Sequence, residues 1–280
     1  HIGTPGTDQR TTATLFSTGR VEIAQGASMK VHGCYPLNDS CFYGVAVGNA
    51  AALTGARGTS YVHGELRVAG TFTQERGNFL VAEGPNADGD VFQDGGIVSI
   101  VDNPGLEGAN TRGEVAIGAF GGHGRYTLTA GAFTTGHNVY LGGATTNDLF
   151  RWHVNGDVLQ QYHDARGVLA VSGGSFTTAK NLILGRDGTG VLALTGAGTV
   201  AAASLVVSNT VGQAASEIRF TVDAERRCGV IDPATRVVFL PGARVVVDVT
   251  AEAAQKTPRR VRVWSFNTAP EGLENVTFEL

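Results

Sequence analysis

One glycine-led phrase occurs twice in direct succession, and it constrains the fold of this chain more than any other feature. The copies begin at Gly167 and Gly190 and read GVLAVSGGSFTTAKNLILGRDGT and GVLALTGAGTVAAASLVVSN. Apolar residues stand two, four, fifteen and seventeen positions after each of these glycines. The same offsets recur after Gly64 and Gly124. This self-similarity indicates a repeat architecture in which each copy is one supersecondary unit.

Each copy predicts three short strands separated by tight corners. Apolar residues alternate with polar or small residues, which is the period of a strand and not of a helix. Phe133 and Phe176 mark the middle strand in two copies. The corners are rich in glycine, which accepts the positive φ values of sharp bends. Three strands and their corners make one turn of a coiled sheet, and its inward residues are buried only when the next turn stacks on it.

The repeats resemble the strand repeats of bacterial autotransporter passengers and related secreted proteins. The resemblance is carried by three phrases, GRYTLTAGAFTTGHNVYLGG, GVLAVSGGSFTTAKNLILGR and GVLALTGAGTVAAASLVVSN. It implies a right-handed parallel β-helix, the fold shared with pectate lyases, and an exported protein. We therefore expect an all-β chain folded as a β-solenoid and located outside the cell or on its surface.

The repeats do not run through the whole chain without interruption. Residues 1–18 are polar and predict a leader or cap, and residues 19–212 hold the repeats. We expect insertions at 34–41, 83–96 and 144–166, where the alternation of apolar residues breaks down.

The last part of the chain, residues 213–280, follows a different pattern. Charged and bulky apolar residues alternate strictly in segments such as SEIRFTV and ARVVVDV. This alternation predicts strands with one face in water, in a more antiparallel arrangement that caps the solenoid. The closing strand VTFEL predicts pairing either within the cap or with a neighbouring copy.

Composition excludes several functional classes. The chain has 40 glycines in 280 residues, and its charged residues make up 16%, against an average of about 25%. A net charge of −4 and the lack of a Lys/Arg run argue against a nucleic-acid partner. No apolar run approaches the roughly 18 residues of a membrane helix, so we expect no membrane span.

The three cysteines predict one local disulfide. Cys34 and Cys41 bracket the loop YPLNDS, whose Pro36 and Asn38 favour a turn. A disulfide between them is the preferred interpretation, and two free thiols in a loop are the alternative. Cys228 is left over, either buried and inert or linked to a partner chain.

One acidic segment is a candidate calcium site. Asn86, Asp88, Asp90 and Asp94 place oxygen ligands at alternating positions around a flexible glycine, as calcium prefers. The glycine lies between the acids and no twelfth-position Glu follows, unlike in an EF-hand loop. A solvated Asp/Gly turn between strands explains the same residues and is the favoured interpretation. We therefore expect no cofactor, with calcium as the alternative.

The insertion at 144–166 is a candidate ligand-binding loop. Aromatic residues next to histidines can form a platform on which a sugar stacks, or supply a catalytic His–Asp pair with Asp164. A flap whose aromatic rings pack on the solenoid flank is the favoured alternative. The candidate residues are Trp152, His153, Tyr162 and His163.

Three functions remain open at this stage. Because Asp, Glu, Arg and Lys do not recur at matching outward offsets, we favour a non-enzymatic structural protein that self-associates into a filament, sheath or surface layer. The alternatives are an adhesin that binds carbohydrate or a host surface, and a polysaccharide lyase or hydrolase. For the first we expect head-to-tail contact between the N-terminal turns and the closing residues Asn275, Val276, Thr277, Phe278, Glu279 and Leu280.

Overall fold

The chain is all-β, as the sequence predicts. Nearly all secondary structure of the described residues is strand, apart from the four-residue helix α1 (Ala251–Ala254) and the 3₁₀ turn η3 (Leu273–Asn275). No described helix is long and apolar enough to cross a membrane. The computed structural model describes residues 19–31, 43–49, 62–75, 77–85, 87–101, 114–143, 164–186, 188–209, 214–232, 236–254, 264 and 268–280.

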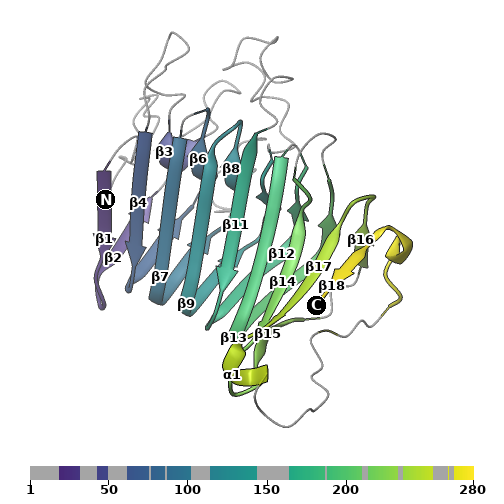
Figure 1. The fold of residues 1–280 in the computed structure, drawn as a ribbon. Coiled ribbons are helices and arrows are strands. Elements are labelled where there is room, and N and C mark those ends of the chain that lie inside the picture. The colour runs from purple at the N-terminus through teal and green to yellow at the C-terminus, as the bar shows by residue number, and fades with distance from the viewer. Residues whose placement is uncertain are drawn as a thin grey trace, which may run out of the picture.

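The first of three columns of parallel strands, here called the first sheet, runs the whole length of the molecule (Figure 1). Each strand pairs with strands that lie one coil earlier and one coil later in the chain. Its members are β1 (Gly19–Ile23), β4 (Val62–Val68), the starts of β7 (Ala87–Ile100) and β9 (His123–Thr135), β11 (Ala165–Val171), the start of β13 (Gly188–Val207), β14 (Glu217–Val222), β17 (Arg244–Val249) and β18 (Thr277–Glu279).

The second and third sheets are built in the same way. The second contains β2 (Ser28–Val31), β5 (Thr71–Gln74), the ends of β7 and β9, the start of β12 (Ser175–Leu184), the middle of β13 and β15 (Cys228–Ile231). The third contains β3 (Tyr43–Asn49), β6 (Asn78–Glu83), β8 (Val115–Ala119), β10 (Val139–Leu141), the ends of β12 and β13, and β16 (Arg236–Phe239).

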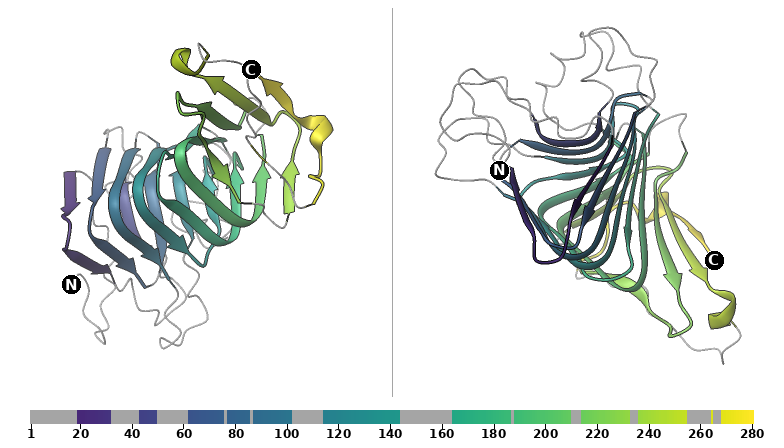
Figure 2. Two further views of the ribbon diagram at one scale, coloured as in Figure 1. Left: turned by 90° about the horizontal axis from the view of Figure 1, so that it is seen from below. Right: turned by 90° about the vertical axis from the view of Figure 1, so that its left-hand side faces the viewer.

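The three sheets form successive coils that stack behind one another when the molecule is viewed from its N-terminal end (Figure 2). Several long strands, such as β9 and β13, bend round a corner and belong to two or three sheets, so hydrogen bonds connect all eighteen named strands. Every pairing between the described strands is parallel.

The register of the strands confirms the repeat that the sequence defines. The glycines that open the copies stand side by side on neighbouring strands, and the sequence missed one further copy, at Gly89. The apolar offsets also coincide, since Leu182 pairs with Val139 and Leu205. The aligned glycines are Gly64, Gly89, Gly124, Gly167 and Gly190.

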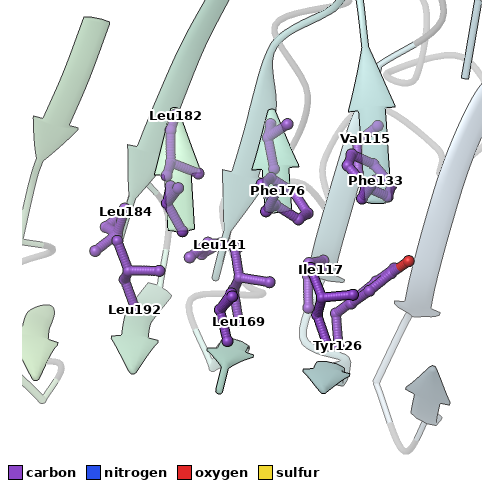
Figure 3. Close-up of a cluster of buried hydrophobic side chains, with 14 of the residues drawn as sticks. Val115, Ile117, Tyr126, Phe133, Leu141, Leu169, Phe176, Leu182, Leu184 and Leu192 are labelled. Carbon is purple, nitrogen blue, oxygen red and sulfur yellow. The ribbon is translucent and has the colours of Figure 1, made fainter. Parts of the chain in front are cut away.

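The inward positions of the three sheets form one continuous apolar core. Side chains of the same offset stack from coil to coil, and the rings of Phe133 and Phe176 lie 4.2 Å apart at an interplanar angle of 1°. Tyr126 meets both rings edge-on. Figure 3 shows these side chains and the leucines of neighbouring coils pointing toward one another from opposite sheets.

The core includes polar side chains at apolar offsets, and the hydrogen bonds of one of them, Gln93, explain why it is tolerated. Gln93 is aligned with Val68 and Leu128 and is 1% exposed. Its Oε1 accepts a hydrogen bond of 2.6 Å from the Tyr126 hydroxyl, and its Nε2 donates to the Ala132 carbonyl at 3.0 Å. A buried amide costs little when its donor and acceptor are both satisfied.

The opening glycine of each copy is required where the third sheet meets the first. A Cβ atom on Gly64 would lie 2.2 Å from the backbone nitrogen of Gly48, and one on Gly167 would lie 2.2 Å from that of Gly142. The facing residues have left-handed backbones, with φ of 72° at Gly48 and 63° at Gly142. Two backbones therefore touch at this corner, so the opening position needs glycine, and the facing position needs a left-handed backbone, which Ala82 adopts beside Gly89 with a φ of 60°.

The acidic stretch 83–96 is not an insertion, and this prediction was wrong. Glu83 ends β6, and Ala87 to Gln93 pair with β4 on one side and with β9 on the other. The segment alternates as a strand does, with Ala87, Gly89 and Val91 buried. Asp88 and Asp90 occupy outward positions, where charged residues are compatible with a strand. The prediction took their charge as the sign of an insertion.

The prediction of a more antiparallel C-terminal segment was also wrong. Strand β14 pairs in parallel with β13 and β17, and β17 pairs in parallel with β18. Strict alternation indicates that one face of a strand is in water and the other in the core. It does not indicate strand direction, because a strand in a parallel stack also has one face in water and one in the core.

Two other predicted interruptions fall largely beyond the structural description. The loop 34–41 lies outside the described residues, and so do 144–163 of the third interruption. Of the remainder, Asp164 is in a turn and β11 begins at Ala165.

Candidate functional site

The C-terminal end of the stack presents an open strand edge. Strand β18 pairs with β17 through Thr277, Phe278 and Glu279, which face Arg244, Val245 and Val246. No described strand pairs with the other edge of β18. Such an edge offers unpaired backbone donors and acceptors to another strand.

Apolar side chains accompany this edge. Phe278 continues the inward column of Val245, yet it is 65% exposed where Val245 is 4% exposed. Leu280, two residues further along, is fully exposed, and Leu240 and Leu273 are also exposed hydrophobic residues. We call the edge of β18 with Phe278 and Leu280 the open end.

Paired charges hold β18 in place. The Arg244 guanidinium donates hydrogen bonds to both carboxylate oxygens of Glu279, one of them at 2.9 Å. These bonds hold the pKa of Glu279 below its usual range and raise the pKa of Arg244. The pair is partly exposed, so its attraction is screened by water, but its forked geometry fixes the strand in register.

A second forked ion pair joins the segment before β18 to strand β16. Arg236 donates to both carboxylate oxygens of Glu271, at 2.8 and 2.9 Å, and lowers the pKa of that carboxyl. The Asn275 amide donates to the Phe239 carbonyl at 3.2 Å. The predicted assembly residues therefore pack on the stack, with Val276 partly buried and the side chains of Phe278 and Leu280 left uncovered.

The opposite end of the stack has the same pattern of residues. In β1, Val21 and Ile23 occupy the inward offsets of Phe278 in β18 and of Leu280, which follows that strand. Val21 is half-buried, whereas Ile23 is 4% exposed. Outward, Arg20 forms ion pairs with Glu22 at 2.9 Å and Glu65 at 3.4 Å. Among the described strands, β1 pairs only with β4.

A second candidate site lies on the outward face of the first sheet, where its strands begin. His63, Asp88, His123 and Arg166 stand in one register row across β4, β7, β9 and β11. Two residues along, Asp90 faces Arg125. We call these six residues the basic–acidic row.

Histidines engage the carboxylates of this row. His63 Nε2 lies 3.0 Å from Asp90 Oδ2, and His123 Nδ1 lies 3.7 Å from Asp88 Oδ1. No ion pair between the described residues involves Arg125 or Arg166, although both side chains are exposed. The row thus ends in two unneutralised guanidinium groups on β9 and β11.

The predicted calcium ligands do not converge. Asp88 and Asp90 are outward neighbours on β7, whereas Asp94 lies beyond an irregularity in the β7–β9 register. Asn86 is outside the described residues. Within the described part of the chain, no three His, Cys, Asp or Glu side chains are grouped to hold a metal ion, and the calcium site stays a prediction.

Two further predictions concern residues beyond the structural description. The disulfide between Cys34 and Cys41 and the ligand candidates Trp152, His153, Tyr162 and His163 all fall there.

The left-over cysteine is in the core. Cys228 is free and 6% exposed, on the inward side of β15. Burial, and secondly the negative charge of Asp223, raise the pKa of its thiol. Its place in the core matches the inert alternative more closely than a link to a partner chain.

Sequence reasoning missed the basic–acidic row, although a signal was present. The residue before each opening glycine is polar or charged, as in His63-Gly64, Asp88-Gly89, His123-Gly124 and Arg166-Gly167. The predictions compared only offsets after the glycine, so this row went unnoticed.

No protein-family model, curated protein or solved structure matches the chain.

Proposed function

We propose that the chain is a right-handed parallel β-helix that serves as a structural protein, a self-associating subunit of an extracellular filament, sheath or surface layer. Parallel pairing of residues one coil apart supports the β-helix. Parallel crossovers are right-handed in nearly all proteins, which supports the handedness. The extracellular location is inferred from the resemblance of the repeats to those of exported passengers.

The observation that carries this proposal is the open end. Proteins manage exposed strand edges by covering, bulging or charging them, because such edges template pairing with another chain. Here an ordered edge carries an aromatic and an aliphatic residue at inward offsets. These side chains are suited to continue the core into a further coil.

We infer that the occupant of the open end is the N-terminal coil of a second copy. In continued register, its Val21 and Ile23 stack on Phe278 and Leu280, apolar on apolar. Its Glu22 then lies directly opposite Glu279, so the two carboxylates depend on Arg20, diagonal to Glu279, and on Arg244, which already makes such a diagonal bond to Glu279 within the chain. Because the two ends of the stack differ, this contact is head-to-tail and produces a linear polymer.

The test is self-association of the purified chain. Sedimentation velocity over a range of concentrations should show growing species, and electron microscopy should show linear particles. The substitution Phe278→Asp should abolish association, because it places a charge in the proposed core contact.

A matched control uses the same strand. Thr277→Asp adds the same charge at the neighbouring outward position and should leave association largely intact. A wild-type chain that stays monomeric at all concentrations contradicts the proposal, and so does equal association of the wild type and Phe278→Asp.

A further inference from the structure

The two unneutralised arginines of the basic–acidic row differ from most of the described arginines. Neither Arg125 nor Arg166 forms an ion pair with any described residue. By contrast, six other arginines are paired with carboxylates within the described ranges. These are Arg20, Arg67, Arg219, Arg227, Arg236 and Arg244.

The geometry explains why Arg125 stays free. It faces Asp90 across the β7–β9 pairing, yet Asp90 is hydrogen-bonded to His63 on the other side. Arg166 faces His123 in the register of β9 and β11 and has no acidic neighbour there. On its other side it faces Thr189, whose hydroxyl donates to the Ala214 carbonyl at 3.0 Å.

The two arginines are close enough to act on one ligand. They lie on neighbouring strands, about 4.8 Å apart, and differ by two positions along the strand, about 6.6 Å. Long side chains reach across such a diagonal. His123 lies beside both, on the strand of Arg125 and in the row of Arg166.

We propose that Arg125, Arg166 and His123 bind a single oxyanion, namely a sulfate, phosphate or carboxylate group. Two guanidinium forks supply charged N–H donors whose spacing matches the oxygens of such groups. Asp90 and Asp88 face Arg125 and His123 from β7, Val168 of β11 faces Arg125 from the other side, and the exposed Asp164 lies two residues before Arg166. The site therefore favours one isolated oxyanion over a continuous polyanion, which would meet Asp88 and Asp90.

Nuclear magnetic resonance of the arginine Nε–Hε groups tests this proposal. The full chain is titrated separately with sodium sulfate, sodium phosphate and sodium glucuronate, at an ionic strength held constant with sodium chloride. The signals of Arg125 and Arg166 should shift and saturate, whereas that of Arg20, already ion-paired on the same face, should not. The anion that saturates identifies the group, tetrahedral or carboxylate.

Variants make the result specific. Arg125→Gln and Arg166→Gln should each weaken the apparent affinity at least about tenfold, because each removes a charge-assisted fork. Arg20→Gln should leave it unchanged. All three positions are exposed, so circular dichroism should show an unaltered fold.

Linear shifts shared by all three arginines, or full affinity in both row variants, would overturn the proposal. Self-association at the open end is measured separately and does not bear on this site.

Discussion

The middle of the stack and its C-terminal end contain the same column of inward side chains in two different environments. Along the first sheet the column runs from Leu192 through Ile218 and Val245 to Phe278. The exposed fractions of these residues are 0%, 0%, 4% and 65%. The sequence pattern fixes which way a side chain points, whereas burial depends on the coil stacked beyond it. At the C-terminal end of the first sheet the inward residue Phe278 is therefore free for contact, whereas Ile23 and Val31 at the N-terminal end are 4% and 0% exposed.

The largest effect is expected from the glycine corner in the middle of the stack. An added Cβ on Gly167 would lie 2.0 Å from the Ile117 carbonyl oxygen and 2.2 Å from the Gly142 nitrogen. Because both are backbone atoms in paired strands, Gly167→Ala should cost more than about 5 kcal/mol of unfolding free energy or prevent folding. Urea denaturation followed by circular dichroism measures this.

The matched control is a glycine outside the corner. Gly26 has a φ of 79°, but an added Cβ there meets nothing within 4 Å. Gly26→Ala should cost only about 1 to 2 kcal/mol, the strain of a left-handed residue with a side chain. Equal losses for the two variants would refute the account of the corner.

The second-largest effect is expected from removing a phenylalanine ring, once in the middle of the stack and once at its C-terminal end. Phe176 is fully buried and stacked on Phe133, so Phe176→Ala should cost about 3 to 5 kcal/mol. Phe278→Ala should change the unfolding free energy by less than about 0.5 kcal/mol, because the ring is mostly in water. Urea midpoints of the two variants measure the contrast. Similar losses would mean that Phe278 is covered within the chain.

A smaller, pH-dependent effect is expected at the open end. The pKa of Glu279 is lowered in the folded chain by its hydrogen bonds from Arg244. Its contribution to stability is therefore complete above the unfolded carboxyl pKa of about 4.3 and is lost as the pH falls through the lower folded value. The urea midpoints of the wild type and Glu279→Gln should differ slightly at neutral pH and converge in acid. A difference that persists or grows in acid would contradict this assignment.

The smallest effect expected is the protection of the buried Cys228 thiol from chemical labelling. Burial raises the pKa of Cys228, so less thiolate is present than in an unfolded chain, and the sulfur is also shielded. In a variant with serine at positions 34 and 41, labelling by iodoacetamide should be at least about tenfold slower when folded than in urea. Equal labelling rates would place Cys228 at the surface.

Much of the fold could be predicted from the sequence, because stacked coils need the same residue types at the same positions. The glycine corner and the apolar offsets recur at fixed spacing, and the register of β9, β11 and β13 matches them. Strand direction in 213–280 could not be read, because alternation arises in either direction. The coil at Gly89 was missed because Asp88 and Asp90 resemble a loop when their outward orientation is unknown.

The candidate sites were harder to predict than the fold. The closing residues were named from the sequence, but their exposure depends on the absence of a covering coil among the described strands, which no pattern records. Which arginines of the basic–acidic row lack an ion pair depends on which carboxylate each histidine and arginine contacts. Asp90 engages His63 and not Arg125, and that choice is made by side-chain geometry across strands.

Disulfide trapping between two different variants tests head-to-tail stacking most directly. A chain with Val21→Cys is mixed with one carrying Phe278→Cys, both with serine at positions 34, 41 and 228, and oxidised gently. Directly paired residues on neighbouring strands satisfy the Cα separation of about 4.4 to 6.8 Å that a disulfide requires. The account predicts a cross-linked dimer from this mixture and little from Val21→Cys mixed with Thr277→Cys, which points outward. Equal cross-linking in both mixtures, or none in either, would contradict it.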